Sequence, residues 1–163
     1  MRWHCDETYL KVDGRWCYLY QAIDADGTLV DALLSETRDR DAATRFFQRA
    51  RTVVGYAPEK VTMDGHDAYP RAIREMLGPE VQHRTSRYMN NRLEQDHRGI
   101  KQRYNPMRGF GSVASAARFC SVYDEVRAQL RYRHPLNGTV SLADQRRLFQ
   151  ERWGAVCAVL QAA

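Results

Sequence analysis

The stretch that decides the fold runs Trp3-His4-Cys5-Asp6-Glu7-Thr8-Tyr9-Leu10-Lys11-Val12 in a chain of 163 residues. Its aromatic and β-branched residues are typical of a strand, and the Asp13-Gly14 pair that follows is a hairpin turn signal. Residues 15–24 and 28–35 have the same character and are joined by a second turn at residues 24–27. The sequence therefore predicts three consecutive strands that pair antiparallel.

The hydrophobic period changes after residue 35, where helices begin to alternate with strands. Asp39 can cap a helix that reaches about Val54, and residues 60–63 form a short strand that ends on Asp64-Gly65. We expect a helix over residues 70–77, a strand over 81–84 and a helix over 89–103, which Pro106 ends. The predicted order βββαβαβα indicates an α/β protein with a mixed sheet and helices on its faces.

The C-terminal segment is predicted to be helical, with one helix over residues 112–132 and one or two over 141–163. We therefore expect a core domain at residues 1–105 and a C-terminal helical extension at 106–163 that packs on it. No apolar run approaches the ~20 residues needed to cross a bilayer, so no membrane partner is expected. Four cysteines without CxxC spacing argue against a zinc ribbon or a secreted disulfide framework, and favour a cytoplasmic chain with reduced thiols.

Positive charge is concentrated in one part of the chain. The formal net charge is +5, and residues 84–108 alone contain seven Arg or Lys against two acids, which is also +5. A basic patch confined to one region is typical of a surface that binds a phosphate backbone. A solvated helix face has the same composition, so charge alone does not establish DNA binding.

Asp6 lies in the middle of the first predicted strand. Alternation along the strand places Asp6 on the same side as Leu10, and Glu7 on the opposite side with Cys5. A carboxylate in a central strand is costly to bury unless its charge is compensated. A divalent metal would compensate it, although a single acid at such a position can also have a structural role.

Two further acids occupy positions that favour the same kind of site. Asp64 ends the strand over residues 60–63, and ligands gather at the carboxyl ends of strands in α/β sheets, although Asp-Gly is also an ordinary turn. Glu94 lies on the polar side of the helix over residues 89–103. Asp96 is turned about 200° away around the helix axis, so both acids cannot face one site, and we prefer Glu94.

Asp6, Asp64 and Glu94 together can bind hard divalent cations. Carboxylates from the first strand, the fourth strand and a later helix can hold two Mg²⁺ ions, for which Mn²⁺ would substitute. Each acid alone is more often structural, and only their joint placement in the order βββαβαβα favours a metal site.

The residues around these acids also resemble a known family. Residues 3–9, 11–24, 64–69 and 88–98, with His83-Arg84 and Gly109-Phe110, are similar to the catalytic domain of bacterial insertion-sequence transposases of the IS-six (IS-twenty-six-like) group. The resemblance covers roughly residues 3–132. It implies a ribonuclease H-like DDE/integrase-type catalytic core, in which Asp6, Asp64 and Glu94 are the catalytic and metal-binding acids.

The resemblance also implies a reaction and its partners. It implies Mg²⁺-dependent strand cleavage at terminal inverted repeats and strand transfer to target DNA. The protein would act as a homodimer or higher assembly in a synaptic complex, in the bacterial cytoplasm and associated with the nucleoid. His97 either contacts DNA, tunes the site, or has a helix-capping or surface role. The expected DNA-binding residues are Arg84, Arg87, Asn90, Asn91, Arg92, His97, Arg98, Lys101 and Arg103.

Two alternatives to an active transposase remain open at this point. Family members carry an N-terminal helix-turn-helix region, whereas here Met1 lies only five residues before Asp6, so we expect that module to be absent. The chain would then be a truncated, non-catalytic remnant or an inhibitor that assembles with full-length transposase. The third possibility is a ribonuclease H-like nuclease or resolvase that cuts DNA without joining it.

Overall fold

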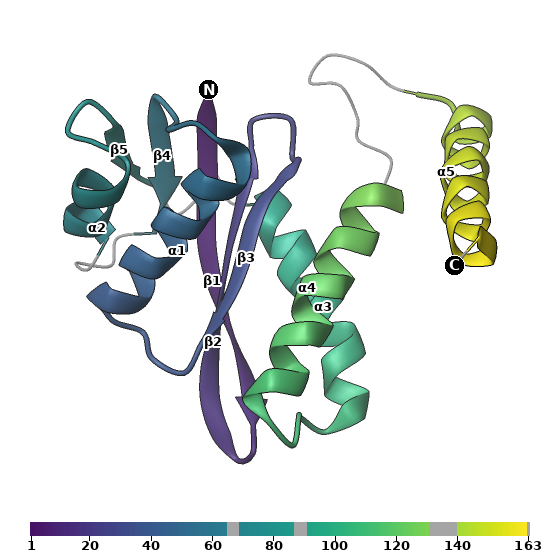
Figure 1. The fold of residues 1–163 in the computed structure, drawn as a ribbon, viewed down its shortest axis with the longest axis horizontal. Helices are drawn as coiled ribbons and strands as arrows, with labels where there is room; N and C mark the ends of the chain where they lie inside the picture. Colours follow the sequence, from purple (N-terminus) through teal and green to yellow (C-terminus); the bar gives the residue numbers. More distant parts are fainter. Residues whose placement is uncertain (65–68, 87–90, 131–139, 163) are drawn as a thin grey trace.

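The sheet has β1 at its centre. The computed structural model describes residues 1–64, 69–86, 91–130 and 140–162. Its described strands have the order β3-β2-β1-β4-β5 in one sheet (Figure 1). β1 pairs antiparallel with β2 and parallel with β4, so the predicted meander and mixed sheet are confirmed. The strands are β1 (Arg2–Val12), β2 (Arg15–Asp24), β3 (Leu29–Ser35), β4 (Lys60–Met63) and β5 (Gln82–Thr85).

The helices follow the strands in the predicted order βββαβαβα. Asp39 caps α1, because its side chain accepts a hydrogen bond of 2.8 Å from the N–H of Ala42. None of the helices in the described ranges is long and apolar enough to span a membrane. The helices are α1 (Arg40–Val54), α2 (Tyr69–Met76), α3 (Asn91–Met107), α4 (Val113–Leu130) and α5 (Leu142–Ala162).

The end of α3 differs from the prediction. Pro106 lies inside the helix, which continues to Met107. A proline this close to the end of a helix removes the hydrogen bond of only one carbonyl. The helix ends instead at Arg108 and Gly109, whose φ angles of 58° and 111° are left-handed. A Cβ at Gly109 would lie 3.1 Å from the carbonyl oxygen of Lys11, so glycine allows the chain to pass close to the end of β1.

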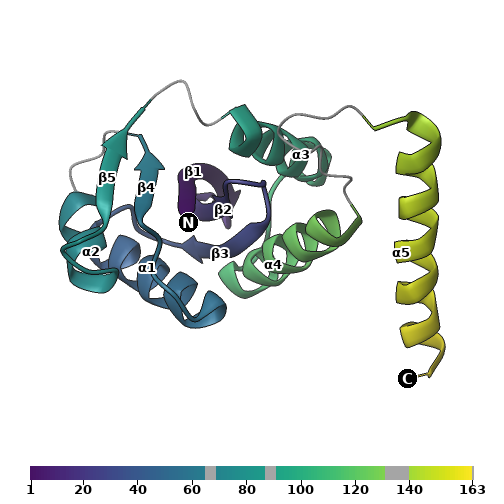
Figure 2. The same cartoon turned by 90° about the horizontal axis from the view of Figure 1, so that it is seen from above.

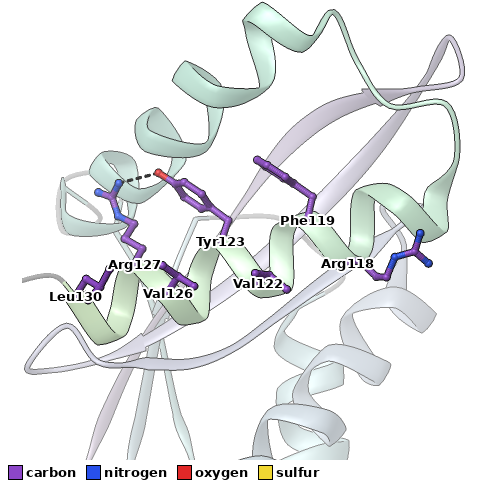
Figure 3. Close-up of a pocket in the computed structure, with 7 residues that line it drawn as sticks. All are labelled: Arg118, Phe119, Val122, Tyr123, Val126, Arg127 and Leu130. Carbon is purple, nitrogen blue, oxygen red and sulfur yellow. Dashed lines mark hydrogen bonds between the residues drawn. The ribbon is translucent and has the colours of Figure 1, made fainter. Parts of the chain in front are cut away.

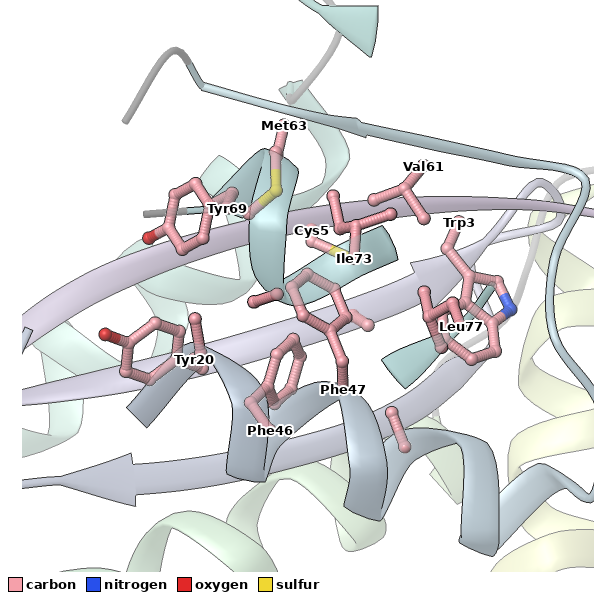
Figure 4. Packing of buried hydrophobic residues seen from close by; sticks show 14 of the residues in the cluster. Trp3, Cys5, Tyr20, Phe46, Phe47, Val61, Met63, Tyr69, Ile73 and Leu77 are labelled. Carbon is pink, nitrogen blue, oxygen red and sulfur yellow. The ribbon is translucent and has the colours of Figure 1, made fainter. Parts of the chain in front are cut away.

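One part of the core lies between the sheet and the helices α1 and α2. Trp3 and Cys5 of β1 are fully buried there, against Phe46 and Phe47 of α1 and Ile73 of α2 (Figure 4). This is the face of β1 on which alternation also places Glu7. Aromatic side chains of this size supply much of the apolar area that the fold removes from water.

The other part of the core lies on the opposite face of the sheet, beneath α3 and α4 (Figure 2). Leu10 of β1 and Leu19 of β2 are fully buried there, against Ile100 of α3 and Ala116 of α4. The predicted alternation along β1 is therefore confirmed. Because Asp6 shares the side of Leu10, its side chain is directed toward the helix that carries Glu94.

The C-terminal helix α5 contributes little to this core. None of its described side chains is buried, and it lies beside α4, away from the sheet (Figures 1 and 2). The outer face of α4 forms an open groove of about 850 Å³, lined by apolar side chains such as Phe119, Val122 and Val126 (Figure 3). The division of the chain at residue 105 stays a prediction.

Candidate metal centre

The pairing of β1 with β4 brings two of the predicted acids together. The last paired residues of these parallel strands are His4 and Thr62. Continued by two residues on each strand, the same register places Asp6 opposite Asp64. Both acids therefore lie at the carboxyl edge of β4, where α/β sheets bind their ligands.

A third carboxylate, which the sequence did not predict, lies beside them. Carboxylate oxygens of Asp6, Glu7 and Asp64 lie within 4.8 Å of one another, a spacing that one divalent ion can bridge. Glu94 is not in this group. It is exposed on the first turn of α3, and its negative charge is close enough to help raise the pKa of Asp6.

Asp6 is mostly buried, and one of its two oxygens accepts a hydrogen bond. Its Oδ1 accepts a hydrogen bond of 3.0 Å from the N–H of Glu7, and its Oδ2 lies 3.7 Å from Nδ1 of His97. Burial is the main cause that raises the pKa of Asp6 to about 7, and the charges of Glu7, Asp64 and Glu94 add to it, against the lowering effect of that hydrogen bond. A bound cation would favour the charged form of Asp6.

His97 lies in the site rather than on an open surface. Its side chain is buried, and burial, followed by the charge of Lys101, lowers its pKa to about 4. The imidazole is therefore neutral at pH 7, and its contact with Asp6 is not an ion pair. Of the roles considered for His97, the structure places it where it can orient Asp6.

Asp64 presents an oxygen that lacks a protein partner. Its Oδ2 lies 3.5 Å from Nη2 of Arg38, whereas its Oδ1 is buried and has no hydrogen-bond partner among the described residues. A buried carboxylate oxygen without a partner is costly. A hard cation prefers such an oxygen as a ligand, so the residues present fit a magnesium or manganese ion.

Glu7 is engaged by residues from two other elements. Arg38, in the loop before α1, forms an ion pair with Oε1 of Glu7, and the Tyr69 hydroxyl of α2 donates a hydrogen bond to Oε2. Burial and the charge of Glu7 raise the pKa of Tyr69 well above its usual value, so Tyr69 keeps its proton. No sequence signal pointed to Arg38, and Tyr69 entered only as the last residue of the resemblance over residues 64–69, because only the fold brings both side chains to β1.

The predicted DNA-binding residues are partly described. Arg84 on β5 is exposed, as are Arg98 and Arg103 on α3, and Nζ of Lys101 lies 4.7 Å from the centre of the Tyr9 ring. Arg87 and Asn90 lie outside the described residues, as do the side chains of Asn91 and Arg92.

Asp96 is directed away from the site. It forms an ion pair of 3.0 Å with Arg127 of α4. This agrees with the helix phase, which places Asp96 and Glu94 on different sides of the helix.

The sheet order and the clustered acids define the class of protein as a ribonuclease H-like catalytic core of the integrase and transposase type. The fold is similar to a chain in the simian T-cell lymphotropic virus intasome in complex with a PP2A regulatory subunit. The TM-score is 0.59 at 16% identity, over 86% of this chain and 50% of that one. It is also similar to the HTLV-2 integrase catalytic core domain in complex with magnesium, with a TM-score of 0.50 at 16% identity over 62% and 66% of the two chains.

The chain belongs to the DDE-domain family of IS240-type transposases, whose model matches residues 1–133. Two similar proteins of Staphylococcus aureus are the transposase for insertion sequence-like element IS431mec and the transposase for IS257 in transposon Tn4003. Each is 42% identical over 107 residues, which is 63% of this chain and 47% of the relative. The chain therefore spans about half the length of these curated relatives.

Proposed function

We propose that this DDE transposase domain cleaves DNA at the ends of an insertion sequence and joins the ends to target DNA. Asp6, Asp64 and Glu94 hold the metal ions for this reaction. The observation that carries the proposal is the meeting of Asp6 and Asp64 at the carboxyl edge of β4, beside a helix whose Glu94 raises the pKa of Asp6. The two similar Staphylococcus aureus proteins are named as transposases, which supports the proposal.

Two of the three acids have contacts that restrain them. The backbone N–H of Glu7 donates a hydrogen bond to Asp6, Nδ1 of His97 lies 3.7 Å from its other oxygen, and Arg38 forms an ion pair with Asp64. When bound, two Mg²⁺ ions supply stabilisation of the attacking and the leaving oxygen of an in-line phosphoryl displacement. The integrase core solved in complex with magnesium supports this choice of ion, and Mn²⁺ would substitute.

DNA would lie along the basic residues beside Glu94. Arg98 and Lys101 follow Glu94 at spacings of four and seven residues on the same side of α3, so the phosphate backbone that they bind passes the metal site. Exposed aromatic rings at Tyr9 and Trp16, 5.1 Å apart edge to face, extend this surface along the β1–β2 hairpin. The partners are terminal inverted repeats and target DNA, bound by a homodimer or higher assembly.

The test is the joining of a labelled terminal-repeat oligonucleotide to a plasmid with Mg²⁺ or Mn²⁺. Glu94→Gln should lower the joining rate by at least roughly 100-fold, which corresponds to about 2.7 kcal/mol. Asp96→Asn is the matched control on the same helix, because Asp96 pairs with Arg127 instead. Full activity of Glu94→Gln would show that the assignment of the acids is wrong.

Other products of the same assay would favour the alternatives. Cut DNA without joined strands would favour a nuclease or resolvase. A folded chain that neither cuts nor joins, but is retained by an intact transposase in a pull-down, would favour a non-catalytic, assembling role.

A further inference from the structure

The metal site has more carboxylates than the proposed triad uses. The three acids whose oxygens lie within 4.8 Å of one another are Asp6, Glu7 and Asp64, whereas the proposed ligands are Asp6, Asp64 and Glu94. Glu7 and Glu94 are therefore rivals for the third position. The choice between them decides which elements hold the metal, since Glu7 belongs to β1 and Glu94 belongs to α3, the helix with the basic residues.

The contacts of Glu7 indicate which of the two acids is available as a metal ligand. Its side chain is only 5% exposed. Its Oε2 accepts a hydrogen bond from the hydroxyl of Tyr69, and its Oε1 forms an ion pair with Arg38, although Oε1 has no hydrogen-bond partner among the described residues. If the buried carboxylate of Glu7 exchanged these partners for a metal ion, the arginine and the hydroxyl would lose their partner, which is costly. Glu94 has no such cost, because it is exposed to solvent.

Arg38 also acts on the neighbouring ligand. Its Nη2 lies 3.5 Å from Oδ2 of Asp64, which leaves Oδ1 of Asp64 as the oxygen without a partner among the described residues. The same guanidinium nitrogen therefore contacts two carboxylates at once. It holds Glu7 on the α1–α2 side of the sheet and restrains Oδ2 of Asp64.

We propose that Arg38 is a positioning residue that keeps Glu7 out of the metal site, so that Glu94 completes it. This inference rests on the proposed function of Asp6, Asp64 and Glu94. Because Glu94 belongs to α3, its binding to the metal brings the basic residues that would bind DNA close to the metal site. In the absence of Arg38, Glu7 takes the third position, because its oxygens already lie within reach of Asp6 and Asp64.

The experiment measures the dissociation constant of Mn²⁺ by electron paramagnetic resonance, without DNA and without turnover. In the wild-type background, Glu94→Gln should weaken Mn²⁺ binding about 10-fold or more, and Glu7→Gln should change it less than about 3-fold. In the Arg38→Met background the order reverses. There Glu7→Gln weakens binding about 10-fold or more, and Glu94→Gln has the small effect.

Arg49→Met is the matched control for the loss of an arginine. Arg49 is also on the α1 side of the sheet and forms an ion pair of 2.9 Å with the buried Asp31, away from the three acids. Arg49→Met should leave the dependence of Mn²⁺ binding on Glu94 unchanged. If Arg38→Met does not fold, as judged by circular dichroism, the wild-type arm still tests the inference, since wild-type Mn²⁺ binding that depends on Glu7 overturns it.

The outcomes separate this inference from the proposed function. Wild-type binding that depends on Glu7, or an Arg38→Met background that still depends on Glu94, overturns the role of Arg38 alone. Wild-type binding that is lost in neither Asp6→Asn nor Asp64→Asn overturns the metal site itself, and the inference with it.

Discussion

Replacement of Asp6 by asparagine is expected to stabilise the metal-free chain, although it removes a metal ligand. In the fold, burial and three neighbouring acids raise the pKa of Asp6 from 3.8 to about 7. An acid whose pKa is raised by folding favours the folded state only while it is protonated. The fold therefore starts to lose stability above about pH 4, where Asp6 ionises in the unfolded chain but stays protonated in the fold, and the effect is complete above about pH 7.

The magnitude follows from the two pKa values. At pH 8 the raised pKa of Asp6 would cost the fold about 4 kcal/mol, and at pH 5, where Asp6 is still protonated in the fold, about 2 kcal/mol, from 1.36 kcal/mol for each pKa unit. Asparagine keeps an oxygen that can accept the hydrogen bond from Glu7 and has no charge. Asp6→Asn should therefore raise the free energy of unfolding by about 2–4 kcal/mol at pH 8, and by about half of that at pH 5.

Urea denaturation in the presence of a chelator, at pH 8 and at pH 5, measures this gain. The same melts with Mg²⁺ should show stabilisation of the wild type and none of Asp6→Asn, because a ligand stabilises only the chain that binds it. Asp124→Asn is the matched control. The pKa of Asp124 is also raised to about 7, mainly by burial, and Asp124 accepts a hydrogen bond of 2.7 Å from Gln21 outside the site.

Asp124→Asn should give a similar pH-dependent gain and keep the response to Mg²⁺. Destabilisation by Asp6→Asn at pH 8, or a gain that does not shrink at pH 5, would refute the electrostatic account of Asp6.

Two other predictions concern the DNA surface and the C-terminal helix. Lys101→Ala should weaken DNA binding and lower the slope of log affinity against log salt by about 1, whereas Lys60→Ala, at the amino end of β4, should not. Equal slopes would contradict the placement of DNA along α3. Trp3→Ala should cost about 3–5 kcal/mol in urea melts, because Trp3 is fully buried. Trp153→Ala, whose side chain is 47% exposed, should cost less than about 1 kcal/mol, and a cost similar to that of Trp3→Ala would show that α5 is part of the core.

The sheet and the position of the acids were accessible from the sequence for local reasons. The alternation along β1, the Asp13-Gly14 turn and the cap at Asp39 are short-range features, and each is confirmed. The helix phase of α3 placed Glu94 and Asp96 on different sides of the helix, and the ion pair of Asp96 with Arg127 agrees with this. The catalytic assignment of the acids stays a proposal.

The residues that surround the acids were not accessible in the same way. Arg38 lies in a loop, and Tyr69 begins a helix; only the tertiary fold brings both to Glu7. His97 falls on the polar side of its helix, and periodicity does not distinguish a side that faces solvent from one that faces buried carboxylates. Pro106 was predicted to end α3, but left-handed residues two positions later end it.

The most direct test of the central claim is a crystal structure of the chain with Mn²⁺, in which anomalous scattering locates the ion. The account predicts a manganese peak bound by Asp6 and Asp64, with Glu94 turned in from α3 and Glu7 still paired with Arg38. A peak bound by Asp6, Glu7 and Asp64 without Glu94 would contradict the role of Arg38, and a peak elsewhere or no peak at all would contradict the metal site.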